Sequence, residues 1–166
     1  AYQQGTSNGG SELFLRPRDL ARIGYLVLKK GRWDDRQIVP ATWIRAMTTA
    51  YAKADFLDYG YGYQWYIDES LPARSFSAQG LGGQYLFVVP ELDLVVVFTG
   101  SLIERSPDAI DLPFFHLRDY IIPALKSEQA LPQDPDANRV LARLLREIEQ
   151  PDPTAVPQLP AIAGRI

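Results

Sequence analysis

The chain has 166 residues, 46% of them hydrophobic and 22% charged, which is the composition of a globular domain with a buried core. Its net charge of −3 and pI near 5.2 exclude the broad basic surface that nucleic acid requires, so we expect no nucleic-acid partner. Without cysteine there is no disulfide, no Cys-ligated metal and no thiol nucleophile. No apolar stretch is long enough to span a bilayer, so no membrane span is expected.

The first predicted element is a helix over residues 16–28, which follows a loop rich in Gly, Ser and Asn at residues 3–11. Pro17 lies near its first turn, and Asp19 lies near the positive end of the helix dipole. Apolar residues recur at helical spacing, and the helix is expected to end near Gly31.

A second helix is predicted over residues 40–48, because it also begins with a proline. We expect Trp43 and Met47 to share its buried face. Between the two helices, Asp34 and Asp35 are paired carboxylates, but their position in a polar segment favours a solvated turn.

Three segments predict β-strands. In residues 59–67 aromatic side chains alternate with Gly and Gln, which indicates a strand that begins near Gly62. Residues 84–89 and 94–99 are almost continuously apolar and are joined by a short loop, so they predict an antiparallel hairpin covered on both faces. The aromatic side chains of the first strand are predicted to form either core or the wall of a cleft: Tyr59, Tyr61, Tyr63 and Trp65.

The last third of the chain predicts two more helices. Residues 114–122 suit a helix packed on the sheet that kinks or ends at Pro123, and His116 within it is expected to be a partly buried structural residue. Residues 134–149 predict an amphipathic helix capped by Asp134, with a stripe of apolar side chains at Leu141, Leu144, Leu145 and Ile148.

Six segments in this order resemble one protein family. They are residues 15–24 (LRPRDLARIG), 30–33 (KGRW), 37–40 (QIVP), 61–65 (YGYQW), 80–84 (GLGGQ) and 89–97 (VPELDLVVV). Together they are similar to the C-terminal third of β-lactamase-related serine hydrolases, the superfamily of class C β-lactamases, penicillin-binding proteins, D-Ala-D-Ala carboxypeptidases and esterases. The resemblance covers about residues 11–125. It implies an α+β fold in which an antiparallel sheet is flanked by helices, that is, part of the serine β-lactamase α/β sandwich.

The resemblance also implies which catalytic residues to look for. The family uses a Ser nucleophile and a Lys in Ser-x-x-Lys, and a Tyr in Tyr-x-Asn or Tyr-x-Ser. Neither motif occurs in this sequence, so no catalytic residue is assigned. The missing motifs are expected upstream of Ala1. No metal and no cofactor is assigned either. The chain alone is therefore predicted to be inactive, as part of an enzyme that acts on an ester, amide or peptide.

The family's third motif, of Lys-Thr-Gly type, lies on a sheet strand beside the nucleophile. It falls within residues 76–83, where we align Ala78, Gln79 and Gly80 with it, although an ungapped comparison places residues 75–77 there. The resemblance implies that a backbone N–H of this strand stabilises the oxyanion. The candidate substrate-binding residues are therefore Ser77, Ala78, Gln79, Gly80, Gly82 and Gly83. Neither alignment supplies a Lys or His at the first position, which favours an uncharged acyl group.

Plainer interpretations of the same residues stay open. The glycines at 80–83 also suit a bulge or a tight strand entry, whereas a phosphate-binding loop would need a following helix. Residues 5–9 (GTSNG) match the Gly-x-Ser-x-Gly nucleophile elbow, but they lack the preceding strand that the elbow needs. The alternative function is a non-catalytic binding or interaction module on the same scaffold.

The expected organisation is a hydrolase segment over residues 1–127, an amphipathic helix over 128–150 and a Pro-rich linker over 151–166 that leads to a further domain. Strands taken from a larger sheet leave a free edge, so the isolated chain is predicted to self-associate. The compartment stays open, a periplasmic or secreted parent protein being one expectation.

Overall fold

The computed structural model describes residues 13–54, 59–100, 112–127, 129 and 131–149. The chain divides into two compact units, residues 1–128 and 129–166. The predicted elbow at residues 5–9 and the Pro-rich segment 151–166 lie outside the described residues.

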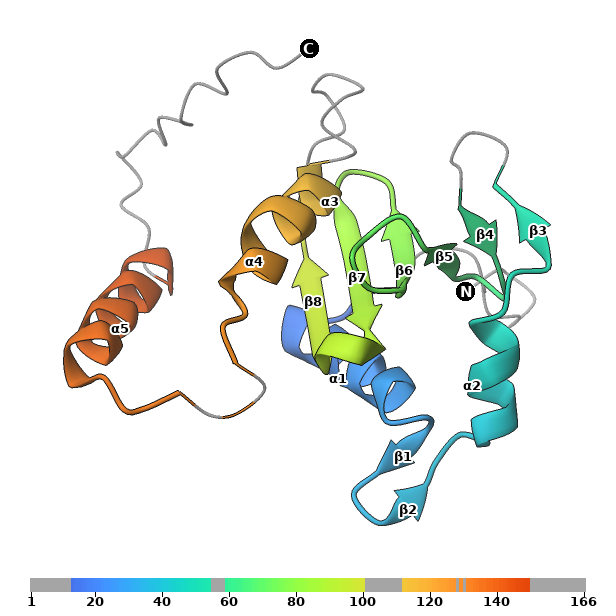
Figure 1. The fold of residues 1–166 in the computed structure, drawn as a ribbon, viewed down its shortest axis with the longest axis horizontal. Helices are drawn as coiled ribbons and strands as arrows, with labels where there is room; N and C mark the ends of the chain where they lie inside the picture. Colours follow the sequence, from blue (N-terminus) through green and yellow to red (C-terminus); the bar gives the residue numbers. More distant parts are fainter. Residues whose placement is uncertain (1–12, 55–58, 101–111, 128, 130, 150–166) are drawn as a thin grey trace. The chain divides into compact units, whose positions relative to one another are not determined.

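The first unit is built on a six-stranded antiparallel sheet, shown in Figure 1. Its strands follow one another in sequence order: β3 (Ala52–Lys53), β4 (Gly60–Tyr61), β5 (Tyr66–Asp68), β6 (Ser75–Gly80), β7 (Gln84–Val89) and β8 (Leu94–Phe98). A separate two-stranded hairpin joins β1 (Arg32–Trp33) to β2 (Arg36–Gln37). Together with the helices described below, this confirms the predicted α+β class with an antiparallel sheet.

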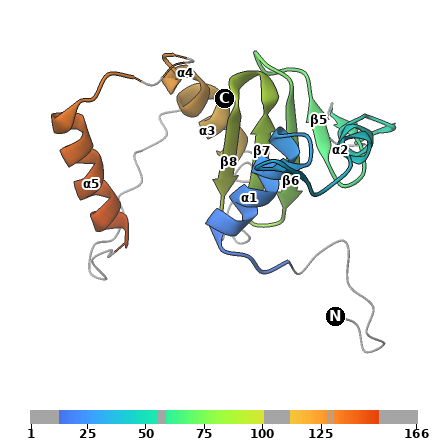
Figure 2. The same cartoon turned by 90° about the horizontal axis from the view of Figure 1, so that it is seen from below.

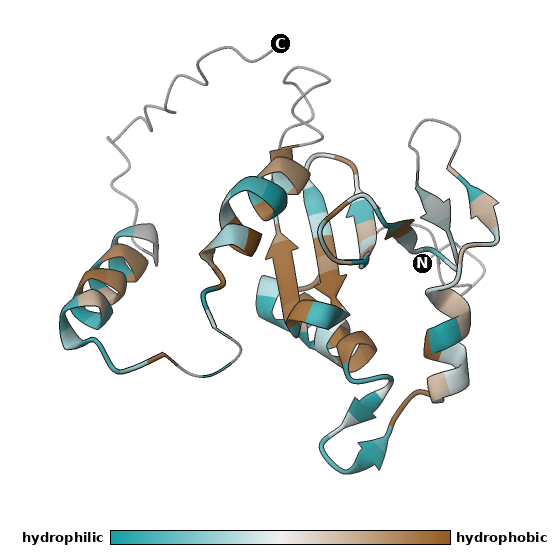
Figure 3. Ribbon diagram, in the orientation of Figure 1, coloured by the Kyte–Doolittle hydropathy of each residue, from teal (hydrophilic) through white to brown (hydrophobic). Residues whose placement is uncertain are grey.

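The predicted apolar hairpin is β7 and β8, which pair from Tyr85↔Phe98 to Val89↔Leu94. A short 3-10 turn (Pro90–Leu92) joins the strands, and Asp93 completes the reversal in the left-handed conformation with φ 47°. Figure 3 shows that β8 is hydrophobic along its length and that β7 is hydrophobic toward its C-terminal end.

Helix α1 (Pro17–Leu28) packs on β7 and β8, as Figure 2 shows. It ends as predicted, because the N–H of Gly31 donates to the carbonyl of Leu26 at 2.7 Å while Gly31 adopts φ 83°. Asp34 and Asp35 are exposed in the turn between β1 and β2, which confirms the predicted solvated turn.

Helix α2 (Ala41–Met47) forms where it was predicted, but its buried face is different. Ile44 is 6% exposed, whereas Trp43 is 50% exposed, so the prediction that Trp43 is buried was wrong. The indole ring instead stacks on Tyr63, with ring centroids 5.3 Å apart. Met47 is partly buried against the core.

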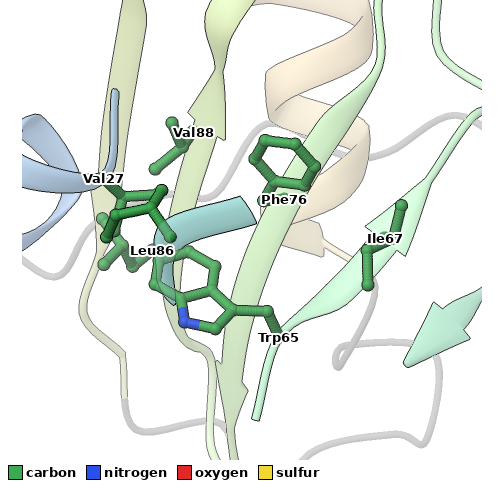
Figure 4. Close-up of a cluster of buried hydrophobic side chains, with 7 residues drawn as sticks. Val27, Trp65, Ile67, Phe76, Leu86 and Val88 are labelled. Atoms are coloured by element: carbon green, nitrogen blue, oxygen red, sulfur yellow. The ribbon is translucent and has the colours of Figure 1, made fainter. Parts of the chain in front are cut away.

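Two apolar clusters cover the two faces of the sheet, because successive residues of a strand point to opposite sides. Figure 4 shows the cluster on one face, formed by Val27, Ile44, Trp65, Ile67, Phe76, Leu86 and Val88. The cluster on the other face contains Leu71, Tyr85, Phe87 and Leu117. The expectation that both faces of the β7–β8 hairpin are covered is therefore confirmed.

The second face is covered by one helical run. It consists of α3 (Leu112–His116), a π-helical turn (Leu117–Ile121) and α4 (Ile122–Ala124), which contains Pro123 in its last turn. Leu117, the first residue of the π-helical turn, is fully buried. His116 is exposed rather than partly buried, and its Nδ1 lies 2.7 Å from the carbonyl oxygen of Leu112.

The second unit contains helix α5 (Pro135–Glu149). Asp134 caps it as predicted, since its Oδ1 accepts hydrogen bonds from the backbone N–H groups of Asp136 and Ala137 at 3.0 and 2.9 Å. Three residues of the predicted apolar stripe are exposed, namely Leu141, Leu144 and Leu145, and the side chain of Ile148 is outside the description. None of the described helices is long and apolar enough to cross a membrane.

Candidate functional site

Strand β6 carries four of the six candidate residues, and it lies inside the sheet between β5 and β7. Phe76 and Ala78 pack on the α1 side, while Ser77 and Gln79 pair across the ladder with Phe87 and Tyr85. Small and polar side chains alternate with apolar ones here. A strand with this composition is stable because both its neighbours supply the buried surface.

The two halves of β6 differ in their pairing. β5 pairs only with residues 75–77, through Asp68↔Ser75, Ile67↔Phe76 and Tyr66↔Ser77. β7 pairs with the strand as far as Gly80↔Gln84. Within the described part of the chain, Ala78, Gln79 and Gly80 therefore have no strand partner on the β5 side.

A tight turn between β4 and β5 explains why Ala78, Gln79 and Gly80 have no strand partner on the β5 side. The N–H of Gly62 donates to the carbonyl of Trp65 at 2.8 Å, and Gln64 adopts φ 63°. The carbonyl of Trp65 is thus used inside this turn, and the pairing with β6 begins only at Tyr66. The aromatic segment therefore forms two short strands, β4 and β5, instead of the single strand predicted from Gly62.

The aromatic side chains of this turn differ in burial. Trp65 is 6% exposed and belongs to the core, whereas Tyr63 is 52% exposed. Tyr63 contacts Trp43 and Tyr51, each with ring centroids 5.3 Å away. Trp65 is thus a core residue, and for the three tyrosines the wall of a cleft stays a prediction.

The glycines follow β6 in a tight turn that leads into β7. Gly82 and Gly83 are buried and adopt φ 84° and 91°, a conformation that favours glycine. The backbone of this turn lies close to Gly100, where a Cβ would meet the Gly82 carbonyl oxygen at 3.0 Å. Gly80 is the exposed glycine of the set, at the end of β6.

Strand β6 itself carries polar side chains but no charged one, although the guanidinium of Arg74 lies over the Phe76 ring, 5.2 Å from its centroid. Gln79 Nε2 donates to Ser77 Oγ at 2.9 Å, which orients both side chains. Arg74, just before β6, donates to the carbonyl of Thr48 at 3.3 Å and lies 3.4 Å from the Glu69 carboxylate. No Lys, Arg or His occurs in β5, β6 or β7.

Two features of this region escaped the sequence analysis. Asp68 is 3% exposed; its Oδ1 accepts from the Ser70 N–H at 2.7 Å, and its Oδ2 has no hydrogen-bond partner. In the sequence it resembles an ordinary turn residue. Tyr66 lies opposite Ser77 and contacts Tyr61 edge-on at 4.9 Å. Burial raises the pKa of the Tyr66 phenol, and the neighbouring Tyr61 adds to this shift.

Among the described residues, no group of three or more His, Asp or Glu side chains is placed to hold a metal ion. His116 is on the α3 side of the sheet, where its ring contacts Phe98 and Tyr120.

Comparison with known proteins finds similar folds among solved structures. No family model matches the sequence, and no curated protein matches it. Among solved structures, the chain is similar to one named as a 6-aminohexanoate-dimer hydrolase from Bacillus anthracis, with a TM-score of 0.47 and 23% sequence identity. The match covers 60% of this chain and 28% of that structure, so the chain spans less than a third of its length.

Proposed function

We propose that this chain is the C-terminal portion of a β-lactamase-related serine hydrolase and supplies the substrate-facing strand of its active site. The supporting observations are the ordered sequence segments, the antiparallel sheet with helices on both faces, and the position of β6 within it. The nucleophilic Ser, its Lys and the Tyr of the second motif are then contributed by another part of the parent protein.

The observation that carries this proposal is the half-paired strand. Residues 75–77 of β6 are paired on both sides, whereas Ala78, Gln79 and Gly80 are paired only with β7. An unpaired stretch of strand offers backbone N–H and C=O groups to an extended ligand. This favours the alignment of Ala78, Gln79 and Gly80 with the third motif over the alignment of residues 75–77.

In this arrangement the contribution of β6 to catalysis is made by its backbone. Attack of a Ser hydroxyl on an acyl carbonyl places negative charge on the carbonyl oxygen, and a fixed N–H group stabilises that charge. Such a group needs close approach and a rigid frame more than a particular side chain. The exposed Gly80 gives access, and the turn through Gly82 and Gly83 fixes the end of the strand.

The substrate is proposed to be an ester or amide with an uncharged acyl group. A carboxylate on the substrate would need a cation next to the strand, and β5, β6 and β7 contain none. Arg74 is engaged with Thr48 and Glu69.

A fluorophosphonate probe tests the proposal, because it labels activated serines. The full-length parent protein should be labelled, and this chain alone should not. Absence of labelling in an intact, folded parent would reject the hydrolase and support the alternative, a non-catalytic binding module on the same scaffold. An upstream Ser-x-x-Lys and Tyr-x-Asn in the parent reading frame would reject that alternative.

A further inference from the structure

A second region of the first unit has the features of a ligand site. A groove of about 500 Å³ lies between one flank of α1, the β1–β2 hairpin and the start of β8, and a second hollow of about 340 Å³ adjoins it. The two share Tyr25, Leu28 and Asp34. We call them together the α1 groove. Figures 1 and 2 show α1 beside β8 and leading into β1. No residue of β6 or of the glycine turn lines it.

The charge of the α1 groove is opposite to that of the protein. Five cationic side chains line it, namely Arg18, Arg22, Lys29, Lys30 and Arg32, against two carboxylates, Asp34 and Asp93. The chain as a whole carries a net charge of −3. A concentration of positive charge in a concave surface raises the local concentration of anions.

Part of this positive charge is neutralised by neighbouring groups. Lys29 Nζ donates to Asp93 Oδ1 at 2.6 Å, and Arg22 pairs with Asp19. Arg18 and Lys30 have no side-chain partner among the described residues, and Arg32 makes only a 3.5 Å contact with the carbonyl of Asp35. The guanidinium and ammonium groups of these residues are therefore available to a ligand.

Aromatic and apolar groups occupy the same groove. Tyr25 and Trp33 contact each other edge-on, with ring centroids 5.5 Å apart and planes at 77°, and they are 41% and 38% exposed. Leu28 and Val95 supply aliphatic surface beside them. A ligand that fits this lining has a planar apolar part as well as a negative charge.

The backbone around the groove is held in an unusual conformation. Lys30 and Asp34 adopt φ 54° and 49°, which side-chain-bearing residues rarely do. Gln37 Nε2 fixes the segment by donating to the carbonyls of Lys30 and Val39 at 2.9 and 2.6 Å. These hydrogen bonds give the groove a rigid frame, which lowers the entropic cost of binding.

We propose that the α1 groove binds a small organic anion, a phosphate or carboxylate attached to an aromatic or similar planar body. The guanidinium of Arg18, which has no partner among the described residues, holds the anionic group through its planar fork. Arg22 adds a second fork by exchanging its exposed pair with Asp19 for the ligand. The rings of Tyr25 and Trp33 contact the planar body. This site is separate from the proposed hydrolase strand and does not depend on it.

Isothermal titration calorimetry of the 166-residue chain with three probes tests the proposal. Phenyl phosphate should bind more tightly than inorganic phosphate, which lacks the ring, and than benzyl alcohol, which lacks the charge. Benzoate in place of phenyl phosphate distinguishes a carboxylate from a phosphate ligand. Raising the salt concentration should weaken binding of both anions. Equal affinity for phenyl phosphate and benzyl alcohol, or no saturable binding of either anion, would overturn the proposal.

Two sets of variants locate the site. The double variant R18Q/R22Q should weaken phenyl phosphate binding by about tenfold or more, since it removes charge-assisted hydrogen bonds. The double variant R45Q/R146Q makes the same change in net charge outside the groove and should leave the affinity unchanged. Trp33→Leu should remove the preference for phenyl phosphate over inorganic phosphate. Circular dichroism confirms that each variant is folded, and equal loss of affinity in both double variants contradicts a site in the groove.

Discussion

Gly24 of α1 lies directly against Val95 of β8, so that a Cβ built on Gly24 would be 2.6 Å from Val95 Cγ1 and 2.7 Å from Leu86 Cδ1. The missing side chain sets how closely the helix approaches the sheet. Adding a methyl group gains about 1 kcal/mol of helix propensity but costs about 1–3 kcal/mol through overpacking. We expect Gly24→Ala to lower the free energy of unfolding by about 1 kcal/mol, and Gly24→Val to lower it further. Urea unfolding followed by circular dichroism measures both, and a stabilised Gly24→Ala would contradict the close packing.

Gly62 and Gly80 form a matched pair for a second stability test. A Cβ on Gly62 would lie 2.2 Å from the backbone carbonyl oxygen of Met47, which cannot move without displacing the end of α2. A Cβ on Gly80 would lie 3.2 Å from the Cβ of Gln84, an exposed residue that can shift. Gly62→Ala should therefore cost about 2 kcal/mol or more, while Gly80→Ala should change stability by less than about 1 kcal/mol. Similar losses in the two variants would show that Gly62 is not confined as described.

The sequence predicted those elements in which a single local pattern dominates. The β7–β8 hairpin was found because two apolar runs flank a Pro-containing loop, and α1 because Pro17, the apolar spacing and Gly31 agree with one another. The Asp134 cap was predictable for the same reason.

Elsewhere the predictions depended on contacts between distant residues, which a local pattern does not contain. Alternating aromatics indicated one strand that begins near Gly62, but a hydrogen bond from the Gly62 N–H to the Trp65 carbonyl turns the chain there. Trp43 was expected in the core, but Ile44 faces the sheet and Trp43 stacks on Tyr63 outside it. A strand at β6 was expected from the family resemblance, since its small polar residues give little β signal of their own. The open side of Ala78 to Gly80 follows from the register with β5, which only the fold reveals.

From the burial of Tyr66 we predict that the fold loses stability at alkaline pH. Burial raises the pKa of its phenol above the ordinary value of 10.0, so the folded state holds the proton more tightly than the unfolded state does. The unfolded state then binds fewer protons above about pH 10, and the free energy of unfolding falls as pH rises from there. Below pH 10 this contribution is fully present. Tyr66→Phe should make the decline above pH 10 shallower, whereas Tyr120→Phe, at an exposed position, should keep the wild-type slope. Identical slopes in chemical denaturation of the two variants would refute the assignment.

The outer edge of β8 predicts self-association of the isolated chain. β8 is the last strand of the sheet among the described residues, and its five residues carry no charge. Edges of this kind tend to pair with another chain. Light scattering should therefore show a mass above that of the monomer that increases with concentration. Thr99→Lys places a charge at the end of this edge and should reduce the association, whereas Thr42→Lys on α2 should not. A wild-type chain that stays monomeric at high concentration would contradict the prediction.

The proposed hydrolase function can be tested by substitution of Gly80. This glycine is exposed at the end of the half-paired strand, and a bulky side chain there would block an extended substrate without entering the core. In the full-length parent protein, Gly80→Val should slow fluorophosphonate labelling by about tenfold or more, since the loss of one oxyanion contact alone costs about 100-fold or more in comparable enzymes. Leu81→Ala is the control, because Leu81 is 74% exposed in the same turn and lies outside β6. Both variants should unfold at nearly the wild-type urea concentration, so a slower reaction of Gly80→Val reports on the site and not on stability. Equal labelling rates in the two variants would remove β6 from the active site.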